Sequence, residues 1–330
     1  MDMSTRFAEQ RETKIFDPRD PSTGTAGAEL LDSTIVQRSN QWWMFLAGQA
    51  QGYGAPQLYS ASLPPGAPLS ATGWNLTRTP DGKLAPLAPQ QASAPWDANG
   101  GRHCPSWVRG WDPHRQQWVE RIYYAGGAQN VWGPYTIGFL EWDGERWIDQ
   151  PEPAFTATED WEHGSVYEPN LIYHDGRWKL WYVAGSNHEN YVVHGYAESV
   201  DGCSGWSQHS IFARAETKMF DFCVRERPGG FDAVFARVWL AGSAAPPETG
   251  LWWCRSANPS GNLSDWGEPV QIMTAEDRGW HSGPWKPSLA FPGPAGNRAF
   301  VFFDGLYRTF DPGPFPFAFT LGCLEIDLPG

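Results

Sequence analysis

Polar residues of the types used in acid and base catalysis stand at the heads of five short strand-like segments of this chain. They are Glu29, Asp32, His103, Ser106, Glu168, Asn170, Asp221, Lys286 and Ser288. If the carboxyls of Asp32, Glu168 and Asp221 shared one pocket, their mutual repulsion would raise the pKa of at least one of them. A carboxyl that holds a proton beside a carboxylate that accepts one is the pair that glycosidic hydrolysis uses. The residue types therefore suggest paired-carboxylate chemistry, provided that the fold brings the segments together.

The segment 166–185, VYEPNLIYHDGRWKLWYVAG, indicates which elements position them. Residues 170–173 predict a short strand, His174-Asp175-Gly176 a tight turn, and residues 178–183 an alternating aromatic strand. Four weaker copies of this hairpin occur, with strand pairs at 32–36 and 41–48, 104–108 and 118–126, 220–225 and 233–242, and 286–290 and 298–305. Each copy continues into further short strands, and helical periodicity is nearly absent.

This repetition predicts an all-β fold, a five-bladed β-propeller with four-stranded antiparallel blades around a central channel. The first strand of each blade would line the channel, so the polar residues that head these strands would converge. Residues 29–330 are expected to form this single domain. Residues 1–28 would add an N-terminal strap or the closing strand, and 80–102 a long insertion that could cover a site.

Composition restricts the partners. The 24 basic and 37 acidic residues give a formal charge of −13, which disfavours nucleic acid and anionic membranes. No apolar run is long enough to span a bilayer, and residues 1–20 lack the apolar core of a secretory signal, so a cytoplasmic protein is expected. Five widely spaced cysteines without a Cys-x-x-Cys pair argue against a zinc motif. Cys104 could be a catalytic thiol, but a small buried filler residue is the favoured interpretation.

Two motifs carry a resemblance to a known family. Asp32-Ser-Thr-Ile-Val-Gln-Arg followed by Gln41-Trp-Trp-Met-Phe, and Glu168-Pro-Asn-Leu-Ile-Tyr-His-Asp-Gly-Arg-Trp, are similar to the first and third blades of five-bladed glycoside hydrolases. These are the family 43 arabinanases and xylosidases, with their fructosidase relatives. The resemblance implies that Asp32 is the general base and Glu168 the general acid. The family's second-blade Ala-Pro-Asp reads Cys104-Pro105-Ser106 here, so the carboxylate that tunes the acid is replaced by Ser106.

Further residues are candidates for binding. Asp221 is expected to join Asp32 and Glu168 as a catalytic residue. The expected substrate-binding residues are Glu29, His103, Ser106, Trp107, Asn170, Trp280, His281, Trp285 and Lys286. Trp280 and Trp285 could stack on a sugar or pack between blades. His103 could bind substrate, bind a cation or be a core histidine, and Lys286 could meet a carboxylate-bearing substrate.

Three functions are compatible with these residues. The leading one is a glycoside hydrolase-like enzyme that acts on a small glycoside or oligosaccharide. A lyase, cyclase or isomerase would use His103, Glu168 and Lys286 as a mixed acid and base set, and a binding propeller would only hold its ligand. No cofactor is expected to be required. A calcium ion in the channel is possible, but a protonated carboxyl is preferred as the way to relieve the acidic crowding.

Overall fold

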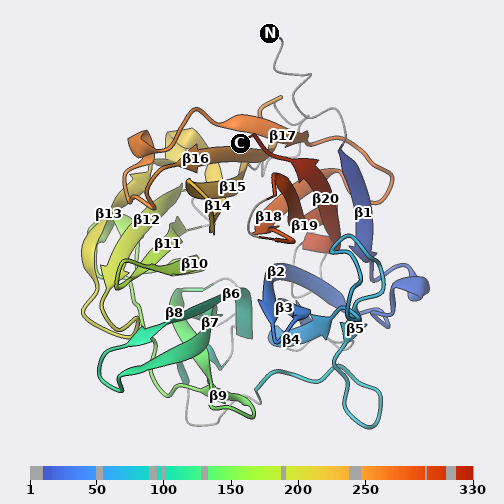
Figure 1. The fold of residues 1–330 in the computed structure, drawn as a ribbon, viewed down its shortest axis with the longest axis horizontal. Coiled ribbons are helices and arrows are strands. Elements are labelled where there is room, and N and C mark those ends of the chain that lie inside the picture. Colours follow the sequence, from blue (N-terminus) through green and yellow to red (C-terminus); the bar gives the residue numbers. More distant parts are fainter. Residues whose placement is uncertain are drawn as a thin grey trace.

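The computed structural model describes residues 10–49, 55–88, 95–98, 101–127, 133–186, 191–237, 247–293, 296–309 and 317–329. Five four-stranded antiparallel sheets surround a central axis, as the repeats predict (Figure 1). Among the described residues no helix is long and apolar enough to cross a membrane.

The first four blades follow the chain in order. They are β2 (Glu29–Arg38), β3 (Gln41–Gln49), β4 (Gln57–Ser62) and β5 (Asn75–Leu76); β6 (Gly101–Asp112), β7 (Gln117–Gly127), β8 (Tyr135–Trp142) and β9 (Trp147–Asp149); β10 (Val166–His174), β11 (Arg177–Ser186), β12 (Tyr191–Ser199) and β13 (Ser207–Ala213); and β14 (Met219–Arg227), β15 (Gly230–Arg237), β16 (Gly250–Ser256) and β17 (Val270–Thr274). The second strand of the fourth blade was predicted at 233–242, and residues 238–242 of this prediction lie outside the described ranges.

The fifth blade combines both ends of the chain. It consists of β18 (Gly283–Ala290), β19 (Arg298–Thr309), β20 (Phe317–Asp327) and the N-terminal β1 (Arg11–Phe16), which pairs with β20 in antiparallel register from Arg11 with Glu325 to Phe16 with Leu321. The remaining regular elements of the described residues are single 3-10 turns: η2 (Pro21–Thr23), η3 (Pro95–Asp97), η4 (Asp160–Glu162), η6 (Ala215–Thr217) and η7 (Leu263–Asp265).

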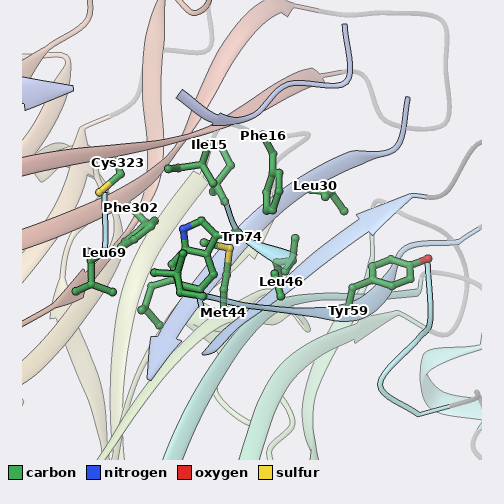
Figure 2. Packing of buried hydrophobic residues seen from close by; sticks show 14 of the residues in the cluster. Ile15, Phe16, Leu30, Met44, Leu46, Tyr59, Leu69, Trp74, Phe302 and Cys323 are labelled. Carbon is green, nitrogen blue, oxygen red and sulfur yellow. The ribbon is translucent and has the colours of Figure 1, made fainter. Parts of the chain in front are cut away.

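Side-chain packing secures this closure. Ile15 and Phe16 of β1 are buried in a cluster with Met44 and Leu46 of the first blade and Phe302 of the fifth (Figure 2). Trp74 lies edge-on to Phe302 in the same cluster, with ring centroids 5.9 Å apart. The cluster thus joins the first and last blades by apolar burial in addition to strand pairing.

Turn chemistry explains why the hairpins form where they do. His174 pairs with Arg177, so Asp175 and Gly176 form a two-residue loop, and their φ values of 50° and 73° are those of a type I′ turn. The predicted insertion 80–102 is partly outside the described ranges. Its described η3 packs on the second blade, where Trp96 stacks on Tyr124.

The feature that positions the polar residues is a bulge that occurs at the same place in all five inner strands. Strand pairing is interrupted between Leu31 and Thr34, His103 and Ser106, Tyr167 and Asn170, Phe220 and Cys223, and Trp285 and Ser288. The first unpaired residue always has a positive φ, between 41° and 58°. This conformation is uncommon for residues other than glycine, and bulges redirect side chains. The sequence placed these residues at strand heads, but the structure shows them at bulges inside the strands.

Candidate functional site

The five bulge residues form a ring of interacting side chains around the channel. They are Asp32 of β2, Cys104 of β6, Glu168 of β10, Asp221 of β14 and Lys286 of β18. Their strands contact one another around the channel, β2 with β6, β6 with β10, β10 with β14, β14 with β18, and β18 with β2 (Figure 1). We call these five residues the channel ring. The sequence predicted the convergence of all of them except Cys104.

One side of the channel ring is organised by Asp32. Its carboxylate accepts hydrogen bonds from the backbone N–H of Cys104 at 3.0 Å and from the Cys104 thiol at 3.4 Å. The backbone N–H of Asp32 donates to both carboxyl oxygens of Asp304 on β19, at 3.0 and 2.9 Å. The Cys104 thiol is also within hydrogen-bonding reach of Glu168. Cys104 therefore lies between the two carboxyls that the resemblance assigns to catalysis.

The other side is organised by Lys286. Its ammonium is in direct contact with Oε2 of Glu168 and lies 3.5 Å from Oδ1 of Asp221. The backbone N–H of Lys286 also donates to Asp221 Oδ2 at 3.0 Å. One cation is thus held between two acidic residues of neighbouring blades.

Burial and neighbouring charges give the carboxyls of the site different pKa values. Burial and the nearby Glu168 charge raise the pKa of Asp32 to about 6. Burial also raises the pKa values of Asp221 and Asp304 well above the usual range, so these two carboxyls favour their neutral forms. Glu168 is the exception. Although burial acts to raise its pKa, the Lys286 charge and hydrogen bonds from Cys104, Lys286 and Asp221 lower it on balance.

Two histidines lie near the channel ring in their neutral forms. Burial lowers the pKa of His103 to about 4 and that of His194, on β12, to about 3. His103 Nδ1 is 3.3 Å from the Cys104 sulfur, and the His103 ring lies edge-on to Tyr135 with centroids 4.8 Å apart. His103 is thus buried and in contact with Cys104 of the channel ring.

Solvent reaches the channel ring at Glu168 and Lys286. Their side chains are 11% and 12% exposed, whereas that of Asp221 is 1% exposed. The cavity that the described residues leave beside them measures only about 10 Å³. A cavity of about 680 Å³ occupies the opposite end of the channel, and Trp107 lines it. Trp107 therefore lies away from the channel ring.

The other predicted binding residues of the first three blades have structural partners. Ser106 Oγ accepts a hydrogen bond from the Leu171 backbone at 3.0 Å, and Asn170 Oδ1 accepts one from Val224 at 2.8 Å. Both residues therefore tie one inner strand to the next. Ser106 was predicted to stand in place of the second-blade carboxylate, and in this structure Cys104 holds the second-blade position of the channel ring. Glu29 accepts a hydrogen bond from the Tyr307 hydroxyl at 3.5 Å.

Of the other predicted residues of the fifth blade, Trp280 and His281 lie together, with ring centroids 4.3 Å apart, and Trp285 lies elsewhere. His281 Nε2 is 3.0 Å from Glu12 Oε1 on β1, so this histidine links the closing strand to the blade. Trp280 packs on Phe303, with ring centroids 6.0 Å apart. Trp285 packs on Phe220 of the fourth blade, with centroids 5.9 Å apart, and so has the inter-blade contact that was one of its two interpretations.

Sequence reasoning missed Cys104, Asp304 and His194 as members of this site. A signal for Cys104 was available, because Cys104-Pro105, Glu168-Pro169 and Lys286-Pro287 share a residue-proline pattern at the bulge. Asp304 and His194 come from second and third strands, for which the repeat offered no comparable signal.

A metal ion could find donor atoms here. Oxygen, nitrogen and sulfur atoms of Asp32, His103 and Cys104 lie within 4.8 Å of one another, and all three residues are buried. The hydrogen bond from the thiol to Asp32 accounts for this proximity without an ion. Lys286 already supplies a positive charge to the ring.

Comparison with known proteins supports the fold at low sequence similarity. No protein-family profile matches the chain, and no curated protein matches its sequence. Solved structures with a similar fold include three glycoside hydrolases. A thermostable family-43 glycoside hydrolase is 14% identical, with a TM-score of 0.62 over 92% of this chain and 94% of that one. A family 117 glycoside hydrolase of Zobellia galactanivorans is 12% identical, with a TM-score of 0.63 over 98% and 90%.

The third is the catalytic domain of a GH62 α-L-arabinofuranosidase of Coprinopsis cinerea, 12% identical, with a TM-score of 0.58 over 90% of each chain. The chain shares the fold of these glycoside hydrolases. Two further structures of this kind were solved with cellotriose and with xylotriose. At 10 to 14% identity the likeness concerns the fold, and function has to be argued from the channel ring.

Proposed function

We propose that this protein is a glycoside hydrolase that cleaves a small glycoside or oligosaccharide with Asp32 and Glu168 as its carboxyl pair. The observation that carries the proposal is the common contact of both carboxyls with Cys104, which brings side chains from the first and third blades together. Their pKa values are displaced in opposite directions, as a pair that divides acid and base work requires.

The surrounding residues support this chemistry. Asp304 fixes the backbone of Asp32, and Lys286 with Asp221 fixes Glu168, so both carboxyls are oriented before a substrate arrives. The fold neighbours include an α-L-arabinofuranosidase and an exo-β-1,3-galactanase, so furanosides and galactosides are reasonable first substrates.

The test is release of nitrophenol from 4-nitrophenyl glycosides of arabinofuranose, xylopyranose and galactopyranose. We expect the wild type to cleave at least one of them. Glu168→Gln and Asp32→Asn should each lower kcat/KM on the order of 10²- to 10⁴-fold, as expected for loss of a general acid or base. Lys179→Met is the matched control, because Lys179 forms its ion pair with Glu198 elsewhere in the third blade. Full activity in both carboxyl variants would exclude the proposed pair.

A further inference from the structure

Lys286 affects which of the two proposed catalytic carboxyls is the general acid and which is the general base. Lys286 occupies the fifth-blade position of the channel ring, where the other four positions hold Asp32, Cys104, Glu168 and Asp221. Its ammonium is in direct contact with Glu168, the more accessible of the proposed catalytic carboxyls. An ammonium this close stabilises a carboxylate and opposes its protonation.

We propose that Lys286 is a positioning residue that keeps Glu168 ionised, so that Glu168 acts as the general base and Asp32 as the general acid. This assignment reverses the roles that the family resemblance implies, and it rests on the proposed glycoside hydrolase function.

The contacts of Glu168 all favour its charged form. Its carboxylate contacts the ammonium of Lys286. It also lies within hydrogen-bonding reach of the Cys104 thiol and the Asp221 carboxyl. Asp221 favours its neutral form and can therefore donate its proton to that bond. The Lys286 ammonium in direct contact with the carboxylate stabilises its charge, although Glu168 is largely removed from water.

The other groups that face Glu168 do not offset this effect. Those that interact with it electrostatically are Asp32, His103, Tyr135, Tyr167 and His194. Burial keeps both histidines and both tyrosines neutral near pH 7. The remaining charge, that of Asp32, is the one that burial disfavours.

Asp32 has the contacts expected of a proton carrier. Its side chain forms no ion pair with a lysine or arginine among the described residues. It accepts hydrogen bonds from the Cys104 backbone and thiol, and burial and the Glu168 charge raise its pKa on balance, although the Lys286 charge and the Asp304 side chain act to lower it. In the proposed reaction the proton of Asp32 passes to the leaving oxygen as the glycosidic C–O bond breaks. A water molecule attacks the anomeric carbon and gives its proton to Glu168. Exchange with solvent then returns Glu168 to the carboxylate and Asp32 to the acid.

Leaving-group dependence distinguishes the two assignments. A variant that lacks the acid retains much of its activity on 2,4-dinitrophenyl glycosides, whose leaving group needs no proton, and loses activity on phenyl glycosides. A variant that lacks the base loses activity on both. We expect the first behaviour from Asp32→Asn and the second from Glu168→Gln. The opposite pattern, or the same pattern in both variants, overturns the proposal.

Lys286→Met tests the positioning role through the pH profile of kcat/KM. Because removal of the ammonium raises the pKa of Glu168, the acidic limb should move to higher pH by about 1 unit or more if Glu168 is the base. Lys286→Arg keeps the charge and should restore most of the wild-type profile, and Lys179→Met should leave it unchanged. A shift of the alkaline limb instead would show that Glu168 is the acid and would overturn the proposal.

A titration without substrate separates failure of this inference from failure of the proposed function. The side-chain ¹³C carboxyl resonance of Glu168, assigned by its loss in Glu168→Gln, should report an ionised group from pH 5 to 8 in the wild type and in Lys286→Arg. Protonation of Glu168 near neutral pH in the wild type overturns the positioning role of Lys286. An ionised Glu168 in a protein that cleaves none of the glycosides removes the proposed function and leaves the electrostatic role of Lys286 in place.

Discussion

Replacement of Asp32 by asparagine should stabilise the folded protein at neutral pH. Asp32 is buried, and its pKa in the folded state is about 6, against 3.8 for an ordinary aspartate. The folded state therefore binds the proton more tightly than the unfolded state does. Its stability falls as the pH rises from about 4 to about 6 and stays lower above that range. Asparagine has nearly the same shape and no such charge.

The size of the effect follows from the difference of 2.2 between 6 and 3.8. At 1.36 kcal/mol for each pKa unit, the upper bound on the stabilisation is about 3 kcal/mol. Part of this is lost if the new amide N–H lacks an acceptor. We expect the free energies of unfolding of Asp32→Asn and the wild type to be similar at pH 4. They should diverge up to pH 6 and remain apart by a constant amount at higher pH.

Urea denaturation at half-unit steps from pH 4 to 8 measures this difference. Asp175→Asn is the control, because Asp175 is exposed in the β10–β11 turn and Asn-Gly also suits a type I′ turn. The control should follow the wild-type curve. If Asp32→Asn were less stable than the wild type at pH 7.5, or if its stability difference did not change with pH, the argument from burial would be wrong.

Three further outcomes are expected. Arg102→Met should lower the free energy of unfolding by about 3 to 5 kcal/mol in the same denaturation assay, because it leaves buried Asp97 and Asp149 without their cation, and an unchanged value would contradict this. Protein purified without chelator should contain no stoichiometric calcium, because the Lys286 ammonium already offsets acidic charge in the channel ring. EDTA should leave its melting temperature unchanged, and a bound ion whose removal lowers the melting temperature would refute this. In the native protein, Ellman's reagent should react quickly with no more than one thiol, the half-buried Cys203, because the other four cysteines are buried. All five thiols should react after denaturation, and rapid reaction of two or more in the native protein would contradict the packing.

The blades could be predicted from the sequence because their causes are local. Alternating aromatic and aliphatic residues, and turns such as Asp175-Gly176, are readable over a few residues. The repeated order of these units gave the number of blades, and the first strands of the blades gave Asp32, Glu168, Asp221 and Lys286 as converging residues.

The details of the site depend on conformations that composition does not encode. The bulge requires a positive φ at Asp32, Cys104, Glu168, Asp221 and Lys286, although none of them is glycine. Without knowledge of the bulge, the family's Ala-Pro-Asp pattern directed attention to Ser106 and not to Cys104. The proton affinities of Asp32 and Glu168 depend on burial and on contacts with residues far away in the chain, so the resemblance alone could not establish their roles.

The pairing of β1 with β20 bears on how the protein is made. Arg11 is opposite Glu325, so the ring cannot close on the ribosome until β20 has been synthesised. Until then β1 has no partner strand, and its edge is free to pair with another chain. A circular permutant that begins at β2 and carries β1 after β20, through a short linker, would keep every blade and make all five hairpin arrays continuous. In such a permutant each blade would be completed before the next is synthesised. The first strand of the nascent chain would be β2, which pairs with β3, the next strand to be made.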